Sequence, residues 1–313
     1  MRLSLRWLRR LLVSRVGVCL LLWLAAVVGL HLGQRRHDEL RLDLAGLFPV
    51  GEPVPAGAVL ATTLAMLVHH ELHDGFGWRP NDFVLWGPAL WADNNANRQL
   101  GIIAAVRVTL AVMMDDLTKA ASDPVDEHLG HADTAFQTDP GRFWSPSAES
   151  RYEEGVQQLA AYVRGLGPAL GVSRPITPQH DGLPHLVAAW AALLAKAHVD
   201  LYRDDARPRP LRPWEDDDVF YRAQGYAHVL AHCTRALQRE YAPRLAKDPG
   251  LAALFERAAV TLHDAATMKP FVVLDGGPES LLANHRRNLD AALADARQTL
   301  ESIRDTLMPA APP

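Results

Sequence analysis

The hydrophobic positions of this chain form one continuous apolar run near the N-terminus, followed by a series of amphipathic stretches. The run extends from Val16 to Leu32 and contains no charged residue. Counted back to Leu11 it holds about 20 residues, which is enough to span hydrocarbon at a helical rise of about 1.5 Å per residue. We therefore predict a transmembrane helix over residues 11–33 that follows a short N-terminal segment, residues 1–10.

A cleaved signal peptide is the alternative interpretation of this N-terminus, because a basic segment and an apolar segment are both present. Two observations favour an uncleaved anchor. The apolar run is longer than that of a usual signal peptide, and no cleavage site of the A-x-A kind follows it. Five arginines precede the run whereas Arg35, Arg36 and Arg41 follow it, so the basic bias favours an N-terminus in the cytoplasm.

Beyond a connector broken by prolines, residues 34–57, the apolar positions recur with the spacing of amphipathic helices. In the first of these, Leu60, Leu64 and Leu67 share one face. Segment 122–146 is polar and is predicted to be a loop. The predicted helices cover residues 58–73, 97–119, 148–165, 185–203, 215–241, 251–268 and 279–307.

An irregular segment rich in aromatic residues, 75–97, interrupts this pattern, because its glycines and prolines forbid a long helix. Its large apolar side chains are expected to fold against the core, since they carry too much apolar area to lie in water. They are Trp78, Phe83, Trp86 and Trp91. The predicted fold is all-α: one transmembrane helix, a bundle-like body of six or seven helices over residues 58–308 with this long internal loop, and a disordered tail, residues 309–313.

Charge is distributed unevenly along the chain. Residues 1–36 hold seven arginines and no acid, so the remainder carries 25 basic and 36 acidic residues, a formal charge of −11. Such an acidic body is a poor match for nucleic acid or for an anionic membrane surface. Of the two cysteines, Cys19 lies in the predicted membrane span, so Cys233 has no partner for a disulfide within the body.

A histidine cluster near the end of the first body helix resembles the H-E-x-x-H motif of zinc proteases but departs from it, since Asp74 stands four residues after His70. His69 and His73 form an i,i+4 pair on one side of the helix. Glu71 falls on the apolar face, with Asp74 on its flank, so the two sets do not converge as a zinc site requires. We therefore interpret the histidines as a surface pair, and expect no metal and no cofactor.

A second i,i+4 pair, His228 and His232, lies opposite the apolar stripe that contains Cys233. Their face of the helix is either solvated or lines a polar cleft, and solvation is the favoured interpretation. Cys233 is expected to be buried. It is a poor candidate for a nucleophile activated by His232, because neighbours in sequence point to different faces of a helix.

Several polar residues lie in or beside the glycine-, proline- and aromatic-rich loops. Asparagine, aspartate and serine are common in turns and helix caps, so ordinary loop chemistry is the simpler explanation. The sharper hypothesis is that some of them converge on a small ligand pocket. No nucleophile elbow, phosphate-binding loop, dinucleotide fingerprint, C-x-x-C pair or EF-hand pattern occurs in the chain.

Four blocks of sequence resemble, in order, a family of uncharacterised proteobacterial single-pass inner-membrane proteins with a domain of unknown function. The blocks are GWRPNDFVLWGPALWADNNANRQLGII, FWSPSAESRYEEGVQQL, PWEDDDVFYRAQGYAHVLAH and VVLDGGPESLLANHRRNLDAALADAR. The resemblance implies a cytoplasmic N-terminus, one anchor and a mostly helical periplasmic body, but no activity or cofactor. The polar positions that match the family pattern are the candidate pocket residues Asn81, Asp82, Asp93, Asn94, Ser147, Glu149, Tyr152, Asp217, Tyr221, Asn284 and His285.

Two functions of different classes fit these observations. The first is a non-enzymatic scaffold or adaptor of the bacterial inner membrane, held in the lipid bilayer through Val16–Leu32 and binding an unknown protein partner in the membrane or periplasm. The second is a small-ligand binder or hydrolase with a pocket lined by carboxylates such as Asp93, Glu149 and Asp217. The second function requires those side chains to meet in one place.

Overall fold

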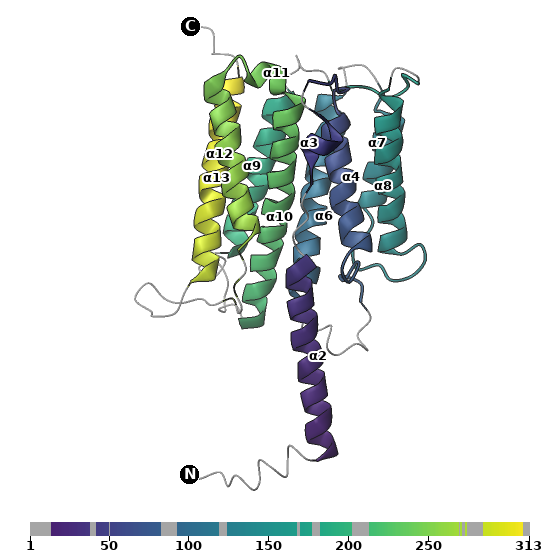
Figure 1. Cartoon of the computed structure of the whole chain (residues 1–313), viewed down its shortest axis with the longest axis vertical. Coiled ribbons are helices and arrows are strands. Elements are labelled where there is room, and N and C mark those ends of the chain that lie inside the picture. Colours follow the sequence, from purple (N-terminus) through teal and green to yellow (C-terminus); the bar gives the residue numbers. More distant parts are fainter. Residues whose placement is uncertain are drawn as a thin grey trace.

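The computed structural model describes residues 14–37, 42–49, 51–82, 93–118, 124–167, 170–176, 182–201, 213–268, 270, 273 and 284–308. Within this part of the chain the fold is all-α, as predicted, with eleven α-helices and no strand. The long helices of the body stand side by side, and α2 (Arg15–His37) projects from one end of them (Figure 1). We call this end of the body the proximal end.

Among the described residues, eight helices of ten or more residues build the body. They run alternately away from and towards the proximal end (Figure 1). Those that start there are α6 (Asn94–Val112), α8 (Ala148–Gly165), α10 (Pro213–Glu240) and α13 (His285–Leu307). Those that run towards it are α4 (Ala58–His73), α7 (Glu127–Phe136), α9 (Gly182–Leu201) and α12 (Pro249–Ala266). A π-helical turn, η1 (Met113–Leu117), extends α6, and α3 (Leu44–Leu47) and α11 (Ala242–Leu245) are single turns.

The predicted bounds of α4 and α8 are confirmed at both ends. Ser147 caps α8 as expected, with its Oγ accepting a hydrogen bond from the Ser150 backbone N–H at 3.4 Å. α4 has no side-chain cap of its own, because Gly57 occupies the N-cap position. The Glu240 carboxylate of α10 replaces that cap by accepting from the backbone N–H groups of Gly57 and Leu60.

The prediction that residues 122–146 form a loop is wrong, because α7 occupies the middle of this segment. Asp126 caps the helix by accepting from the backbone N–H groups of His128 and Leu129. Leu129, Ala132 and Phe136 then face the core at helical spacing. This pattern is short and surrounded by polar residues, and missing it explains why six or seven body helices were expected where the described residues form eight long ones.

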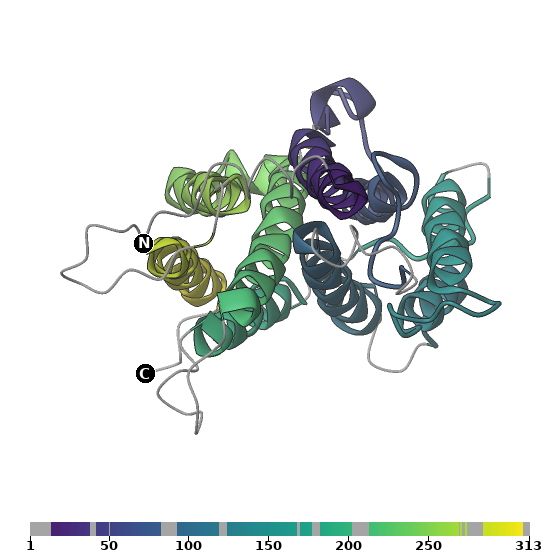
Figure 2. The same cartoon turned by 90° about the horizontal axis from the view of Figure 1, so that it is seen from below.

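The body is held together where α6 crosses α10. A Cβ atom added to Gly225 of α10 would lie 2.2 Å from the Arg98 carbonyl oxygen, and one added to Gly101 of α6 would lie 2.1 Å from the Arg222 carbonyl oxygen. The two glycines therefore let the helix backbones touch. This crossing places α10 in the middle of the body, with α4 and α6 on one side and α9, α12 and α13 on the other (Figure 2).

The connector packs on the body. Leu44 and Phe48 contact the hydrophobic core, and the Arg239 guanidinium donates hydrogen bonds to the carbonyl oxygens of Phe48 and Pro49. Trp78, from the aromatic segment, is buried as expected, whereas Phe83, Trp86 and Trp91 lie outside the described residues. The predicted disordered tail, residues 309–313, also lies outside them.

α2 covers the apolar run, and most of its large hydrophobic side chains are exposed, whereas Trp23, Val27 and Leu30 are partly buried. Val16 is 68% and Leu22 67% exposed, and consecutive residues Leu20 and Leu21 are exposed as well, so the apolar surface extends around the helix. Where side chains are described, no helix offers an uninterrupted stretch long and apolar enough to cross a bilayer. The membrane anchor therefore stays a prediction.

Candidate functional site

The eleven candidate residues all lie towards the proximal end, because four of the body helices begin there and the loop after α4 folds over it (Figure 1). The positive ends of four helix dipoles thus point the same way, and polar side chains near them satisfy unpaired backbone N–H groups. This arrangement explains why sequence blocks far apart in the chain share a polar character.

One group joins the loop after α4 to the start of α8. Asn81 is buried, and its side-chain amide donates to the Glu149 carboxylate at 2.8 Å and to the Arg142 carbonyl oxygen at 3.1 Å. Asp82 pairs with Arg79 at 2.6 Å. Burial raises the pKa of the Asp82 carboxyl, Arg79 opposes this, and the negative charge of Glu149 adds to it. Ser147 belongs to the same region as the cap of α8.

Tyr152 lies one turn further into α8 and is fully buried. Its hydroxyl donates to the Thr138 carbonyl oxygen at 2.8 Å and accepts from the Arg107 guanidinium at 3.2 Å. Burial raises the pKa of this phenol to about 12, so it keeps its proton at neutral pH. Trp78 packs edge-on against its ring with centroids 5.0 Å apart. These contacts make Tyr152 a core residue.

A second group lies where α6 and α10 begin. The Asn97 amide donates to the Asp218 carboxylate at 2.5 Å, and Asp93 is the N-cap residue of α6. Burial, together with the negative charges of Asp93 and Asp218, raises the pKa of Asp217 to about 7. Burial also raises the pKa of Asp93. Two neighbouring carboxyl groups whose pKa values are raised above the usual range are a recognised indicator of a functional site.

The remaining candidates lie near these groups or across the body. Asn94 begins α6, and Tyr221 is buried one turn above Asp217 on α10. Asn284 caps α13 by accepting from the Arg287 backbone N–H at 2.8 Å, and His285 follows it. α13 and α8 lie on opposite sides of α6 and α10 (Figure 2). Whether any of the eleven residues bind a ligand stays a prediction.

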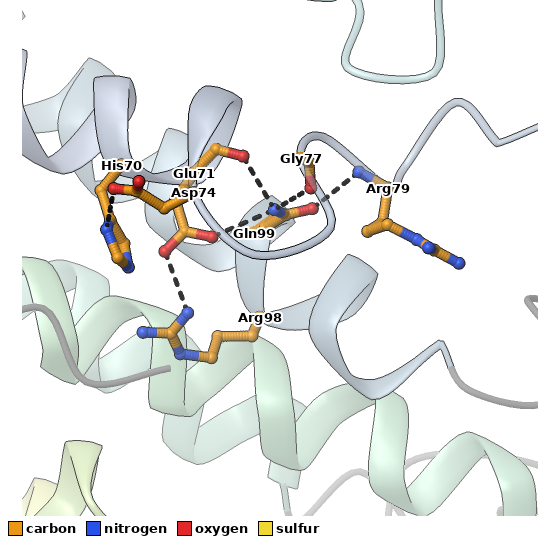
Figure 3. A network of polar contacts seen from close by, with 7 residues as sticks. All are labelled: His70, Glu71, Asp74, Gly77, Arg79, Arg98 and Gln99. Atoms are coloured by element: carbon orange, nitrogen blue, oxygen red, sulfur yellow. Dashed lines mark hydrogen bonds and ion pairs between the residues drawn. The ribbon is translucent and has the colours of Figure 1, made fainter. Parts of the chain in front are cut away.

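A buried network that sequence reasoning did not identify connects α4 to α6 (Figure 3). Glu71 pairs with Arg98 at 3.0 Å, and their side chains are 5% and 2% exposed. The Gln99 amide donates to the second Glu71 oxygen at 3.0 Å and to the Gly77 carbonyl oxygen at 3.0 Å, and its own oxygen accepts from the Arg79 backbone N–H at 2.8 Å. The sequence contains one indication of this network, because Glu71 is the one acid on the apolar face of its helix.

The histidine face of α10 is not solvated, contrary to the favoured interpretation. His228 is buried and Tyr221 and Gln224 on the same face are buried too, because helices cover α10 on both sides. Burial and the nearby Arg98 charge keep the pKa of His228 well below its usual value. Burial lowers the pKa of His232 to about 4, helped by His263. Both imidazoles are therefore neutral at neutral pH.

The apolar stripe on the same helix is confirmed. Cys233 is fully buried, and burial raises the pKa of its thiol far above the usual range. A thiol that keeps its proton at neutral pH is a weak nucleophile. Cys19, in α2, is exposed.

The first histidine pair meets a partner from another helix. His73 Nε2 lies 2.7 Å from a Glu153 carboxylate oxygen of α8, and the His69 and His73 rings stand 4.4 Å apart between centroids. One ligand atom from each of the three side chains lies within 4.8 Å of the other two. Spacing within one helix correctly separated this pair from Glu71, but it could not reveal a carboxylate 80 residues away.

Residues 17–171, just under half of the chain, match the model of a family described as an uncharacterized protein conserved in bacteria (DUF2333). The match agrees with the resemblance to an uncharacterised bacterial family, and it brings neither an activity nor membrane anchoring. No curated protein and no solved structure matches the chain significantly.

Proposed function

We propose that this DUF2333-like protein is a non-enzymatic scaffold of the bacterial inner membrane, with α2 as its anchor and its body in the periplasm. The observation that carries the proposal is the set of exposed apolar side chains on α2, which projects alone from the body (Figure 1). Apolar side chains exposed around most of a helix are favourable in lipid and unfavourable in water. The arginines before Val16 set the cytoplasmic side.

Aromatic side chains at the proximal end support this orientation. Trp144 is 77% exposed, and Phe143 packs edge-on against it with centroids 5.4 Å apart. Phe76 is also exposed and reaches the end of α2, since a Cβ atom on Gly33 would lie 2.8 Å from its ring. Tryptophan and other aromatic residues favour the interface between lipid and water. The end of the body from which α2 projects would therefore rest near the headgroups.

The interior of the body supports a scaffold more than an enzyme. The Glu71–Arg98–Gln99 network links α4 to α6, Tyr152 is held in the core, and Ser147 and Asn284 serve as helix caps. Each of these polar groups already has a structural role. A helical body of this kind would hold a binding surface at a fixed place above the membrane.

Crosslinking and co-purification from native membranes test the scaffold directly. Full-length protein is compared with a full-length variant in which residues 16–32 are replaced by an unrelated apolar span, so that both proteins remain anchored. Reproducible capture of one membrane or periplasmic partner supports the proposal, and loss of that partner in the variant places the contact on α2. If neither protein captures any envelope component, the scaffold proposal fails.

A hydrolase or small-ligand binder is the second candidate, favoured by the raised pKa values of Asp93 and Asp217. A carboxyl group with a pKa of about 7 can exchange protons at neutral pH. Ligand profiling of the full-length protein, purified in detergent, tests this function. A small molecule that travels with wild type but not with Asp217→Asn would support it, whereas identical profiles would exclude a role for this pair.

A further inference from the structure

We propose that His69, His73 and Glu153 form a Zn²⁺ site that links the end of α4 to the start of α8. The site is independent of the scaffold function. It also goes beyond the expectation from sequence spacing, which considered only residues of α4. Two imidazoles and one carboxylate make up a common ligand set for zinc that keeps a position open for water.

The distances suit a small metal ion. Zinc binds imidazole nitrogen and carboxylate oxygen at about 2.0–2.2 Å, so tetrahedral ligand atoms lie roughly 3.3–3.6 Å apart. The three candidate ligand atoms already lie within 4.8 Å of one another. His73 Nε2 and the Glu153 oxygen, at 2.7 Å, would separate slightly, and His69 would approach by rotation about its side-chain bonds.

The two helices hold the ligands in place. His69 and His73 are one turn apart on α4, so both rings project from the same side of the helix. α4 and α8 pack against each other along their length, with Tyr162 of α8 close to Gly57 at the far end. The Gln157 amide donates to the other Glu153 oxygen at 3.3 Å, which leaves the oxygen nearer His73 for the metal. Such outer hydrogen bonds orient ligands.

The neighbourhood favours a cation held at the surface. His69 and His73 are exposed and Glu153 is half-buried, so an ion can enter from solvent and keep water as its fourth ligand. Glu71, between the two histidines in sequence, points inwards to Arg98 and does not compete for the metal. The alternative is a simple surface contact between His73 and Glu153, which contributes little to stability.

Zn²⁺ titration of the full-length protein in detergent, carrying an affinity tag without histidine, tests the site. Wild type should bind one Zn²⁺ per chain at this position, and Co²⁺ should give the absorption of a tetrahedral or five-coordinate ion. His69→Ala, His73→Ala and Glu153→Gln each remove a direct ligand. Each should therefore weaken binding by more than the roughly 10- to 100-fold that loss of an outer-shell hydrogen bond costs.

His198→Ala is the matched control, because His198 also contacts a carboxylate at 2.7 Å, that of Asp290, but far from α8. It should bind Zn²⁺ as wild type does. Circular dichroism checks that every variant keeps its helical content. The proposal is overturned if wild type binds no Zn²⁺, or if His69→Ala/His73→Ala retains wild-type affinity. It is also overturned if Glu153→Gln retains full affinity, since α8 would then contribute no ligand.

Discussion

Replacing Glu71 by glutamine should destabilise the body strongly. The substitution keeps the shape of the side chain but removes the negative charge that lies 3.0 Å from the Arg98 guanidinium, which is 2% exposed. Breaking a buried ion pair by removing one partner costs about 3–5 kcal/mol, mainly because the remaining charge is still desolvated. In a domain of this size about 1 kcal/mol corresponds to roughly 2–4 °C, so the unfolding midpoint should fall by roughly 6–20 °C.

Removing both charges together should destabilise the body less than removing Glu71 alone. In Glu71→Met/Arg98→Met neither charge of this pair remains, and replacement of a buried pair by apolar groups is often neutral. The double variant should therefore be more stable than Glu71→Gln, with a small loss because Gln99 no longer has its carboxylate acceptor. A double-mutant cycle that includes the two single variants measures the coupling free energy between Glu71 and Arg98.

The assay is unfolding of the full-length protein in detergent, followed by circular dichroism during heating and during addition of urea. Arg257→Gln is the matched control, because it removes the exposed ion pair between Arg257 and Asp295, and such pairs contribute about 0–1 kcal/mol. If the free energy of unfolding of Glu71→Gln lies within about 1 kcal/mol of that of wild type, the network does not stabilise the body.

Three further predictions concern the helix crossing, the acidic group and the cap of α4. Gly225→Ala should lower the unfolding midpoint strongly, because a methyl group at Gly225 would push α10 away from α6. Gly29→Ala is the control, since its Cβ would meet no atom within 4 Å, and melting curves of the two variants measured in parallel check the difference. Asp217→Asn should stabilise the protein at pH 8 but not at pH 4. A carboxyl pKa raised to about 7 means that the folded state holds the proton more tightly than the unfolded state, so wild-type stability falls as pH rises from about 4 to 7. If the variant keeps the same pH profile of stability as wild type, the raised pKa does not belong to Asp217. Glu240→Ala should lower the free energy of unfolding by about 1–2 kcal/mol, because α4 loses its cap. Urea unfolding measures this against Glu52→Ala in the exposed connector, and equal stability of the two variants would argue against the cap.

The helices were predictable where apolar spacing and caps agree. Leu60, Leu64 and Leu67 define α4, and Ser147 marks the start of α8, so both helices were located correctly. α7 was missed because ten residues with few large apolar side chains carry a weak periodic signal, and its cap, Asp126, lies in a polar stretch. The local pattern thus located the longer helices of the body and missed the shortest of the eight.

The polar arrangement was less predictable because it depends on which helices become neighbours. His228 lies on a polar face that the sequence alone presents as a solvated surface, yet α10 sits in the middle of the body and that face is covered. Glu71 and Arg98 pair across 27 residues, and His73 and Glu153 across 80. Periodicity along one helix gives the direction of a side chain, but the partner comes from the packing of the whole bundle.

Protease protection in spheroplasts, combined with alkaline extraction of membranes, measures both whether the protein is anchored through α2 and on which side of the membrane its body lies. We expect full-length protein to stay in the membrane pellet at alkaline pH and protease added outside the spheroplasts to digest the body. The N-terminal segment should remain protected. Release of intact protein by alkaline extraction, or a body that is protected until the inner membrane is broken, would contradict the account.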